Sequence, residues 1–420
     1  MRLPIFNLLK LKSLSLYFVS SIITAGIGIF INPFLSIGLS HKDFAIIGYY
    51  AAFSSLFVPF LSLALSNYYA RKYYQIEKEK REKIYQTILS IYLILGALTL
   101  MILIVAYFFY HKNYVKSIEF FPYAILSFLP LYFINFYNLY LLDLRMKNKA
   151  KQYSIISIAN AVLGAALSLL MVYFFHYGAI GRLLALLVTS VLFSVFAFNI
   201  KKFKFLIDKD IAKEAFLFSW PLIISAVLSF FFMGIDRTFL EKINDNYNLG
   251  LYNVGLQISG YLSIFGTVLF QTFQPDIYKY TSKNEHKKLL KLALFVLVLN
   301  AVPIVLFIML SEPLISVLTY GKYIESVDFA KILSVKLIAT TFAFLMSEIL
   351  VGYGFSKMEL LNRILGAIFS VVIYLFFIKY WGFYGAAWGQ SVTWIVMGII
   401  SLLSLFFVKF RKTSNTTNNS

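Results

Sequence analysis

The sequence predicts an all-α membrane protein with twelve transmembrane helices, and three observations support this class. Of the 420 residues, 60% are hydrophobic and only 14% are charged, whereas soluble domains have about 45–50% and about 25%. Apolar runs of about 18 residues or more, long enough to cross hydrocarbon about 30 Å thick, recur along the whole chain. Lys and Arg gather in the short segments between these runs, where positive residues set membrane orientation.

The expected spans are apolar runs bounded by charges and turn residues. Residues 1–12 are basic and show no small-residue cleavage site, so they are expected to lead into a retained first span. The twelve spans are expected at residues 14–38, 44–69, 85–110, 119–142, 153–175, 178–199, 214–240, 249–274, 289–310, 327–352, 360–379 and 383–408.

Both termini are predicted to be cytoplasmic. The side of the termini carries 28 Lys and Arg residues and the opposite side carries 6, and cytoplasmic loops hold the positive excess. The net charge of +19 therefore indicates topology and contact with anionic membrane lipids, and no nucleic acid is expected, because no basic domain stands apart to face a duplex. The absence of Cys excludes disulfides and thiol catalysis. No metal site is predicted, since the histidines are scattered at 41, 111, 176 and 286.

A weak internal similarity divides the chain into an N-lobe (residues 1–205, six spans) and a C-lobe (residues 206–420, six spans). Two glycine patterns recur at nearly the same offset: Gly-x-Tyr at 48–50 and 250–252, and Gly-x-x-Gly at 178–181 and 382–385. Because each half has an even number of spans, the halves would run parallel, as in transporters whose substrate site lies between two repeats. Alternatively, the glycines only let helices pack closely.

Motifs in the second half resemble a known transporter family. They are Trp-Pro at 220–221, Gly-Ile-Asp-Arg at 234–237, Leu-Gly-Leu-Tyr-Asn at 249–253, and an outer loop with Glu-Pro-Leu-Ile at 312–315 and Tyr-Gly-Lys-Tyr at 320–323. In order and spacing they resemble the polysaccharide-transporter family of the multidrug/oligosaccharidyl-lipid/polysaccharide exporter superfamily, and within it the O-antigen type of flippase. The resemblance covers nearly the whole chain.

The resemblance implies two lobes around a central cavity and alternating access in the bacterial inner membrane. It implies an undecaprenyl-diphosphate-linked oligosaccharide as substrate. No cofactor is expected. Candidate partners are a polysaccharide polymerase and a chain-length regulator, and proton or sodium coupling is an open alternative. Peptidoglycan-precursor flippases usually have more than the twelve spans expected here, which argues against that branch.

Charged residues inside spans are the first candidate site residues, because a charge in the bilayer is costly unless it faces a cavity or a partner. Lys336 lies roughly 14 Å into the tenth span, with Thr340 and Ser347 on its face, and is either a cavity cation or part of a buried ion pair. Asp236 and Arg237, about 25 Å along the helix from Trp220 and near the outer surface, form either a gate or a helix-end pair.

The other candidates each have an ordinary alternative. Arg182 reaches either the cavity or the outer interface, and Glu348 either carries the coupling ion or is an interfacial carboxylate. Asp143 is expected to pair with Arg145 in a loop. Neutral amides would bind sugar hydroxyls or link helices; these are Asn135 and Asn138 in the fourth span, Gln271 and Gln274 in the eighth, and Asn300 in the ninth.

Two rival functions are weighed. A multidrug exporter that expels organic cations would favour carboxylates in the N-lobe spans, whereas the deepest charge here is Lys336. A polysaccharide polymerase would carry a large outer loop, and a glycosyltransferase would use the Asp-Lys-Asp of residues 208–210 with a nucleotide-binding domain. The outer loops are short, and Asp208 is expected to cap the seventh span. The sequence thus predicts a transporter without catalytic residues.

Overall fold

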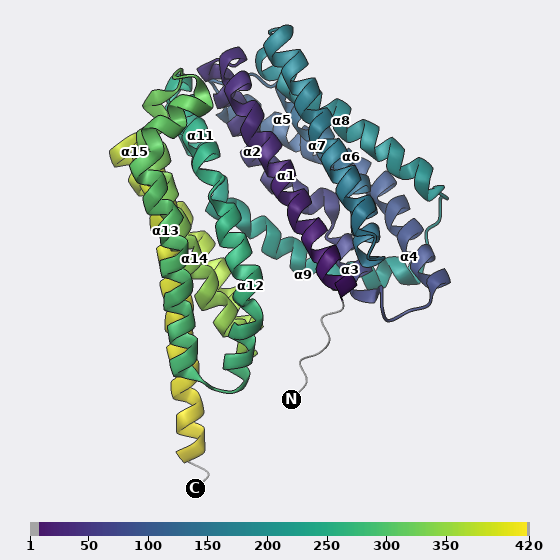
Figure 1. Ribbon diagram of the computed structural model, residues 1–420, viewed down its shortest axis with the longest axis vertical. Helices are drawn as coiled ribbons and strands as arrows, with labels where there is room; N and C mark the ends of the chain where they lie inside the picture. Colours follow the sequence, from purple (N-terminus) through teal and green to yellow (C-terminus); the bar gives the residue numbers. More distant parts are fainter. Residues whose placement is uncertain (1–7, 418–420) are drawn as a thin grey trace. The chain divides into compact units, whose positions relative to one another are not determined.

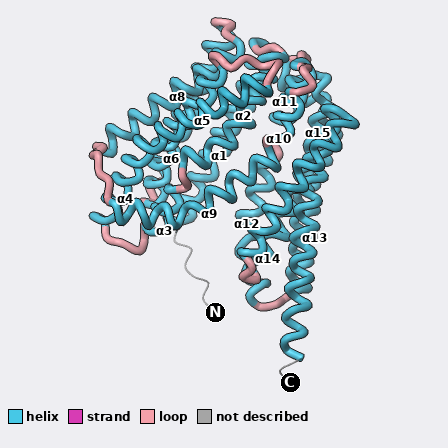
Figure 2. Tube along the Cα trace, turned by 180° about the vertical axis from the view of Figure 1, so that it is seen from behind, coloured by secondary structure: helices cyan, strands magenta, loops and turns pink. Residues whose placement is uncertain are grey.

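The computed structural model describes residues 8–417, except for the side chains of residues 8–15, Phe18, Gln271 and residues 408–417. Within this range Figure 2 shows helices and loops only. The chain divides into two compact units, Met1–Val227 and Leu228–Ser420. Their boundary lies inside α9 (Lys209–Met233), later than residue 205, and the duplication itself stays a prediction.

The N-terminal unit is a helical bundle arranged around α6 (Figure 1). α6 contacts α2, α3, α5, α7 and α8, which makes it the central helix of this unit. The bounds are α1 (Leu8–Gly38), α2 (His41–Ser62), α3 (Leu65–Lys72), α4 (Lys78–Ile91), a π-helical turn (Tyr92–Gly96), α5 (Ala97–Tyr114), α6 (Tyr123–Met146), α7 (Ala150–Leu169), a second π-helical turn (Leu170–Phe174) and α8 (Gly178–Lys201).

The C-terminal unit is arranged around α14, which contacts α11, α12, α13 and α15. α15 is broken at Gly382, whose φ of 54° and ψ of −129° are not helical. After the end of α9, the bounds are α10 (Ile235–Glu241), α11 (Asn246–Gly260), α12 (Ser263–Ser282), α13 (His286–Thr319), a 3₁₀ turn (Ile324–Ser326), α14 (Val327–Gly352) and α15 (Ser356–Thr417).

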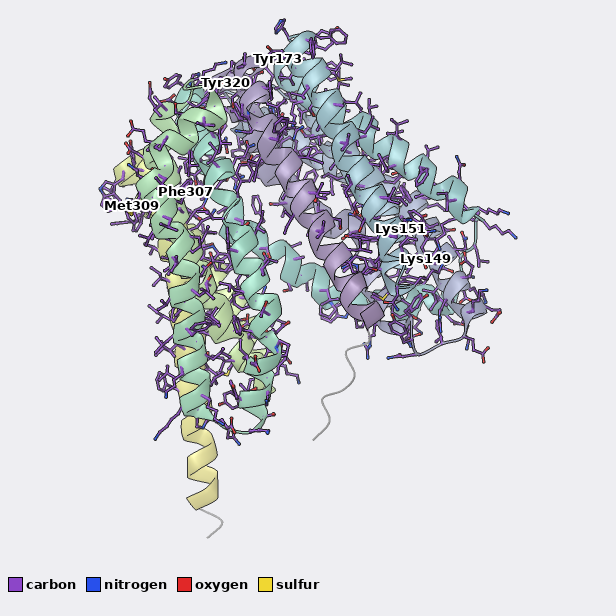
Figure 3. The ribbon with its side chains drawn as sticks, viewed as in Figure 1. Lys149, Lys151, Tyr173, Phe307, Met309 and Tyr320 are labelled. Atoms are coloured by element: carbon purple, nitrogen blue, oxygen red, sulfur yellow. The ribbon has the colours of Figure 1, made fainter. Side chains whose placement is uncertain are left out.

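The membrane class predicted from the sequence is confirmed. Eleven helical stretches of the described chain are long and apolar enough to cross a membrane. The last, Ser356–Phe407, contains both of the last two predicted spans, separated by Gly382. The exposed face of α13 is apolar. Met309 on this face is 74% exposed, whereas Phe307, two residues earlier, is packed inside and 6% exposed (Figure 3). Lipid contact requires such a surface, so the chain is a multi-pass membrane protein.

Three predicted spans are interrupted, which the sequence analysis did not foresee. Leu63 and Ala64, with φ of 47° and 49°, separate α2 from α3. Gly234 separates α9 from α10, and a turn at residues 261–262 separates α11 from α12. The apolar pattern continues through each interruption, so hydrophobicity alone does not reveal a change of backbone direction.

The outer loop expected between the ninth and tenth spans is shorter than predicted. Residues 312–315 lie inside α13, which continues to Thr319, and only residues 320–323 form the turn. Pro313 is accommodated within the helix, because membrane helices tolerate proline where neighbouring groups satisfy the freed backbone carbonyl.

The two Gly-x-x-Gly patterns have the same local role. Gly178 and Gly382 have φ of 53° and 54°, in the left-handed region that favours glycine. A Cβ atom at Gly181 would lie 2.9 Å from the nearest carbonyl oxygen, and one at Gly385 would lie 2.0 Å from it. In both patterns the first glycine turns the chain and the second lets two helices approach. This likeness supports the predicted repeat.

Gly385→Ala is expected to lower the midpoint of thermal unfolding in detergent by about 3–10 °C, because overpacking costs about 1–3 kcal/mol. The new Cβ would meet the carbonyl oxygen of Phe377 at 2.0 Å, so backbone rather than a flexible side chain has to move. Gly26→Ala is the control, since nothing lies within 4 Å of its Cβ position, and it should unfold at or slightly above the parent temperature because Ala favours the helix. Equal midpoints for both variants would contradict the close approach.

The Asp-Lys-Asp motif caps a helix, as predicted. Asp208 Oδ1 accepts hydrogen bonds from the backbone N–H groups of Asp210 and Ile211, both at 3.0 Å, at the start of α9. Lys83 Nζ lies 2.6 Å from Asp208 Oδ2. The hydrogen bond from Lys83, together with the backbone N–H of Ile211, holds the pKa of the Asp208 carboxyl below its usual range.

Candidate functional site

The C-terminal unit contains a cavity of about 650 Å³, with apolar and polar lining, between α9, α10, α11, α12, α13 and α14, within the range of about 300–1,000 Å³ typical of ligand sites. Five residues singled out from the sequence, Arg237, Gln274, Asn300, Lys336 and Glu348, line this one cavity. Further polar lining comes from Ser263, Thr267, Thr340 and Thr341.

One face of α14 runs along the length of the cavity. Lys336, Thr340, Phe344 and Glu348 all line it and follow one another at intervals of four residues, which places them on the same side of a helix. From Lys336 to Glu348 the face extends roughly 18 Å. Ser347, expected on the same face, is buried and is not among the lining residues.

At one end of the cavity, Lys336 is held by an uncharged partner. Its Nζ donates to Oε1 of Gln390 at 2.5 Å, and within the described chain no carboxylate forms an ion pair with it. The amide nitrogen of Gln390 in turn donates to Asp236 Oδ2 at 2.7 Å and to the Tyr252 hydroxyl at 2.8 Å. Tyr252 also donates to the Asp236 carboxylate. Gln390 therefore connects a cation in the cavity to a carboxylate behind it.

Arg237 supplies the second cation at this end. Its Nε lies 3.5 Å from Asp236 Oδ1, and its guanidinium donates to the carbonyl oxygen of Met233. Asp236 is fully buried and does not line the cavity. Its carboxylate offsets part of the positive charge from behind, as the burial of two neighbouring cations requires.

The opposite end carries a carboxylate. Glu348 Oε2 accepts from Gln274 Nε2 at 3.0 Å and from the Tyr278 hydroxyl at 2.5 Å. Between the two ends, Asn300 Nδ2 donates to the hydroxyl of Thr341 at 2.7 Å. The cavity is therefore polarised along α14, with two cations at one end, a carboxylate at the other, and amides and hydroxyls between them. Such a lining accepts an anionic group joined to a hydroxyl-rich body.

The remaining predicted residues do not join this cavity. Arg182 lines a separate cavity of about 250 Å³ in the N-terminal unit and donates to Ser168 Oγ at 2.5 Å. Asn135 is buried and donates to the carbonyl of Leu131, whereas Asn138 is exposed, so the two do not share an environment. The side chain of Gln271 lies outside the described residues.

The predicted ion pair between Asp143 and Arg145 is not formed, so this prediction is wrong. Asp143 binds Lys147 at 2.7 Å and also Lys201, while the Arg145 guanidinium lies 5.8 Å from the ring centroid of Tyr153. The reason is helical geometry: residues two apart point to different sides, whereas residues four apart are neighbours.

Gln390 and Tyr252 were not predicted from the sequence, although both belong to the end of the cavity that holds Lys336 and Arg237. Gln390 follows Trp388 and Gly389 in the apolar twelfth span, and the rule that selected Asn300, a polar amide inside a span, would have selected it as well. Tyr252 was noted only as part of a motif, because nothing in its own spacing indicates a partner sixteen residues earlier in the chain.

Fold and cavity together define a multi-pass membrane protein with a charged cavity in its C-terminal unit. The fold matches that of the lipid II flippase MurJ in its inward closed conformation, with a TM-score of 0.71 and 15% identity over 93% of this chain and 87% of that one. It also matches an inward-facing multidrug resistance MATE family transporter of the MOP superfamily, with a TM-score of 0.74 and 16% identity over 94% and 96% of the two chains.

The chain belongs to the family of polysaccharide biosynthesis proteins, whose model matches residues 11–277. An uncharacterized membrane protein of Haemophilus influenzae is 26% identical over 277 residues, which are 64% of this chain and 65% of that relative. The Lsg locus putative protein 1 of the same organism is 25% identical over 87% of this chain and 89% of that protein. The resemblance to this polysaccharide family is confirmed, and the O-antigen type stays a prediction.

Proposed function

We propose that this protein moves an oligosaccharide linked to undecaprenyl diphosphate, an O-antigen or capsule repeat unit, across the bacterial inner membrane by alternating access. The glycan travels from the cytoplasmic to the outer leaflet, and both termini are cytoplasmic. The observation that carries the proposal is the pair of cations, Lys336 and Arg237, at one end of a cavity whose other polar lining is mainly amides and hydroxyls, beside apolar side chains. Membership of the polysaccharide biosynthesis family supports a glycan as cargo.

The chemistry of the lining fits this cargo. A diphosphate is best held by charge-assisted hydrogen bonds from Lys and Arg, while sugars need neutral donors and acceptors such as Asn300, Thr340 and Thr341. The organic cation of a multidrug exporter would be repelled at the end where Lys336 and Arg237 lie.

The decisive experiment deletes the gene. The mutant should accumulate lipid-linked glycan that faces the cytoplasm and should lose surface polymer, while its resistance to cationic dyes stays unchanged. A strain that keeps its surface polymer and loses dye resistance would instead identify a drug exporter. Co-purification of a polysaccharide polymerase or a chain-length regulator would indicate that the protein works in a membrane complex with that partner.

We further propose that Glu348 carries the ion that couples transport to a proton or sodium gradient. It is a carboxylate in the cavity wall, away from both cations, and membrane carboxylates serve as ion carriers. In proteoliposomes, an imposed gradient should stimulate transport by the parent protein, and this stimulation should fall about tenfold in Glu348→Gln because the amide cannot release a proton or neutralise a sodium ion.

Glu312→Gln is the matched control for ion coupling, since Glu312 is an exposed carboxylate on α13 outside the cavity. It should respond to the gradient as the parent does. A Glu348→Gln variant that keeps full stimulation would remove Glu348 from the coupling step and leave the proposed cargo unaffected.

A further inference from the structure

A second charged cavity lies in the N-terminal unit, apart from the one already described. It measures about 440 Å³ and is formed by the end of α6, the turn to α7, the beginning of α7 and the end of α8. Three lysines line it, Lys147, Lys149 and Lys201. Figure 3 shows Lys149 at the foot of α7, the end of the unit at which α1 begins.

A buried carboxylate fixes two of these lysines. The Asp143 side chain is 2% exposed and lies 2.7 Å from Lys147 Nζ, with Lys201 on the same oxygen. The hydroxyl of Tyr69 donates to its other oxygen at 2.6 Å. The Lys201 side chain is itself only 9% exposed, and its Nζ lies 4.0 Å from the ring centroid of Tyr85. The ammonium groups are therefore preorganised, and little conformational freedom remains to be lost when an anion binds.

The charge of this cavity does not balance. Among the residues that line the cavity, one carboxylate faces three ammonium groups, which leaves two positive charges, and Lys149 forms no ion pair with any described residue. Gln152 adds an amide to the lining. A cavity with two uncompensated cations favours a small multivalent anion such as a phosphate.

The same cavity is open to an apolar surface. Ile155 and Ile200 line it and are 57% and 48% exposed, on helices that span the membrane. A free phosphate would gain nothing from these isoleucines, whereas a lipid would place its phosphate among the lysines and an acyl chain against the apolar side chains.

We propose that this cavity binds the phosphate headgroup of an anionic phospholipid from the leaflet on the side of the α6–α7 turn. Charge complementarity selects an anionic lipid over a zwitterionic one, whose own ammonium group would compete with the lysines. The assignment concerns a different cavity from the proposed transport cavity and does not depend on what the protein transports.

The test is lipid binding to the purified full-length protein, measured by native mass spectrometry with phosphatidylglycerol and phosphatidylcholine. Lys147→Gln with Lys149→Gln should bind phosphatidylglycerol about thirtyfold more weakly, on the basis of about 1 kcal/mol per lysine. Lys149→Gln alone leaves the Asp143 contacts intact and should weaken binding about fivefold. Lys151→Gln is the control: Lys151 is exposed two residues further on and does not line the cavity, so binding should not change.

Three results would overturn the assignment. The first is equal affinity for phosphatidylglycerol and phosphatidylcholine, and the second is parent-like binding by the correctly folded Lys149→Gln and double variants. The third is displacement of phosphatidylglycerol by micromolar geranyl diphosphate, which would assign the cavity to a polyprenyl diphosphate instead. Displacement only by an excess of phosphatidylglycerol itself, with no effect of millimolar inorganic phosphate, supports the phospholipid.

Discussion

Replacing Lys336 by alanine is expected to abolish the export of surface polymer while the protein still inserts at its normal level. Lys336 lines the cavity, and the cargo phosphate would lose a charge-assisted hydrogen bond of about 1.5–3 kcal/mol, which is at least about a tenfold loss of transport. Complementation of a deletion strain measures the loss as surface polymer, and immunoblotting of membranes measures the protein level.

Two companion variants sharpen this prediction. Lys336→Arg keeps the charge and should retain partial activity, whereas Lys331→Ala removes a lysine from the same helix without changing the cavity lining and should behave as the parent. Full polymer export by a normally expressed Lys336→Ala variant would separate the cavity cation from the cargo, and the diphosphate assignment would fail with it.

The second large effect is expected at Asp236. Its carboxylate accepts from Gln390 at 2.7 Å and from Tyr252, and lies beside Arg237. Asp236→Ala leaves these donors unpaired and Arg237 buried without a counter-charge, a loss of about 3–5 kcal/mol. The unfolding temperature in detergent should therefore fall by about 10 °C or more.

Two further variants, Asp236→Asn and Asp245→Ala, are comparisons for the stability loss expected in Asp236→Ala. Asn keeps an acceptor oxygen but no charge, so its effect should be intermediate. Asp245 caps α11 by accepting from the backbone N–H of Asn248 at 3.0 Å, and its removal should cost only about 1 kcal/mol. If Asp236→Ala and Asp245→Ala unfold at the same temperature, the buried network contributes no more than an ordinary helix cap.

The membrane class and the positions of the spans could be predicted because hydrocarbon imposes length and apolarity on every span. The tenth span was predicted at residues 327–352, which are the bounds of α14. The interruptions at residues 63–64 and 261–262 could not be predicted, since they change backbone direction without changing side-chain polarity. The predicted end of the ninth span was too early, because Glu312 and Pro313 were interpreted as loop residues.

The candidate site was predictable in its charges but not in its connections. The cost of burying a charge selected Lys336, Arg237 and Glu348, and the structure places all three in one cavity. Which helices face each other is decided by packing between distant segments, so Gln390, 54 residues after Lys336, stayed hidden. For the same reason Arg182, selected by its charge, and Asn135, selected as a polar amide, lie elsewhere.

The interrupted helices have a mechanical consequence for the cavity. Two of the helical walls of the cavity are interrupted. Met233 and Arg237 lie on either side of the break at Gly234, and Gly260 and Ser263 lie on either side of the turn between α11 and α12. Rotation about a few backbone dihedrals at these joints would widen or narrow the space beside Lys336, and α14 itself could stay rigid. A chamber built this way can change its volume through a few residues, while Lys336 and Glu348 keep their spacing on α14.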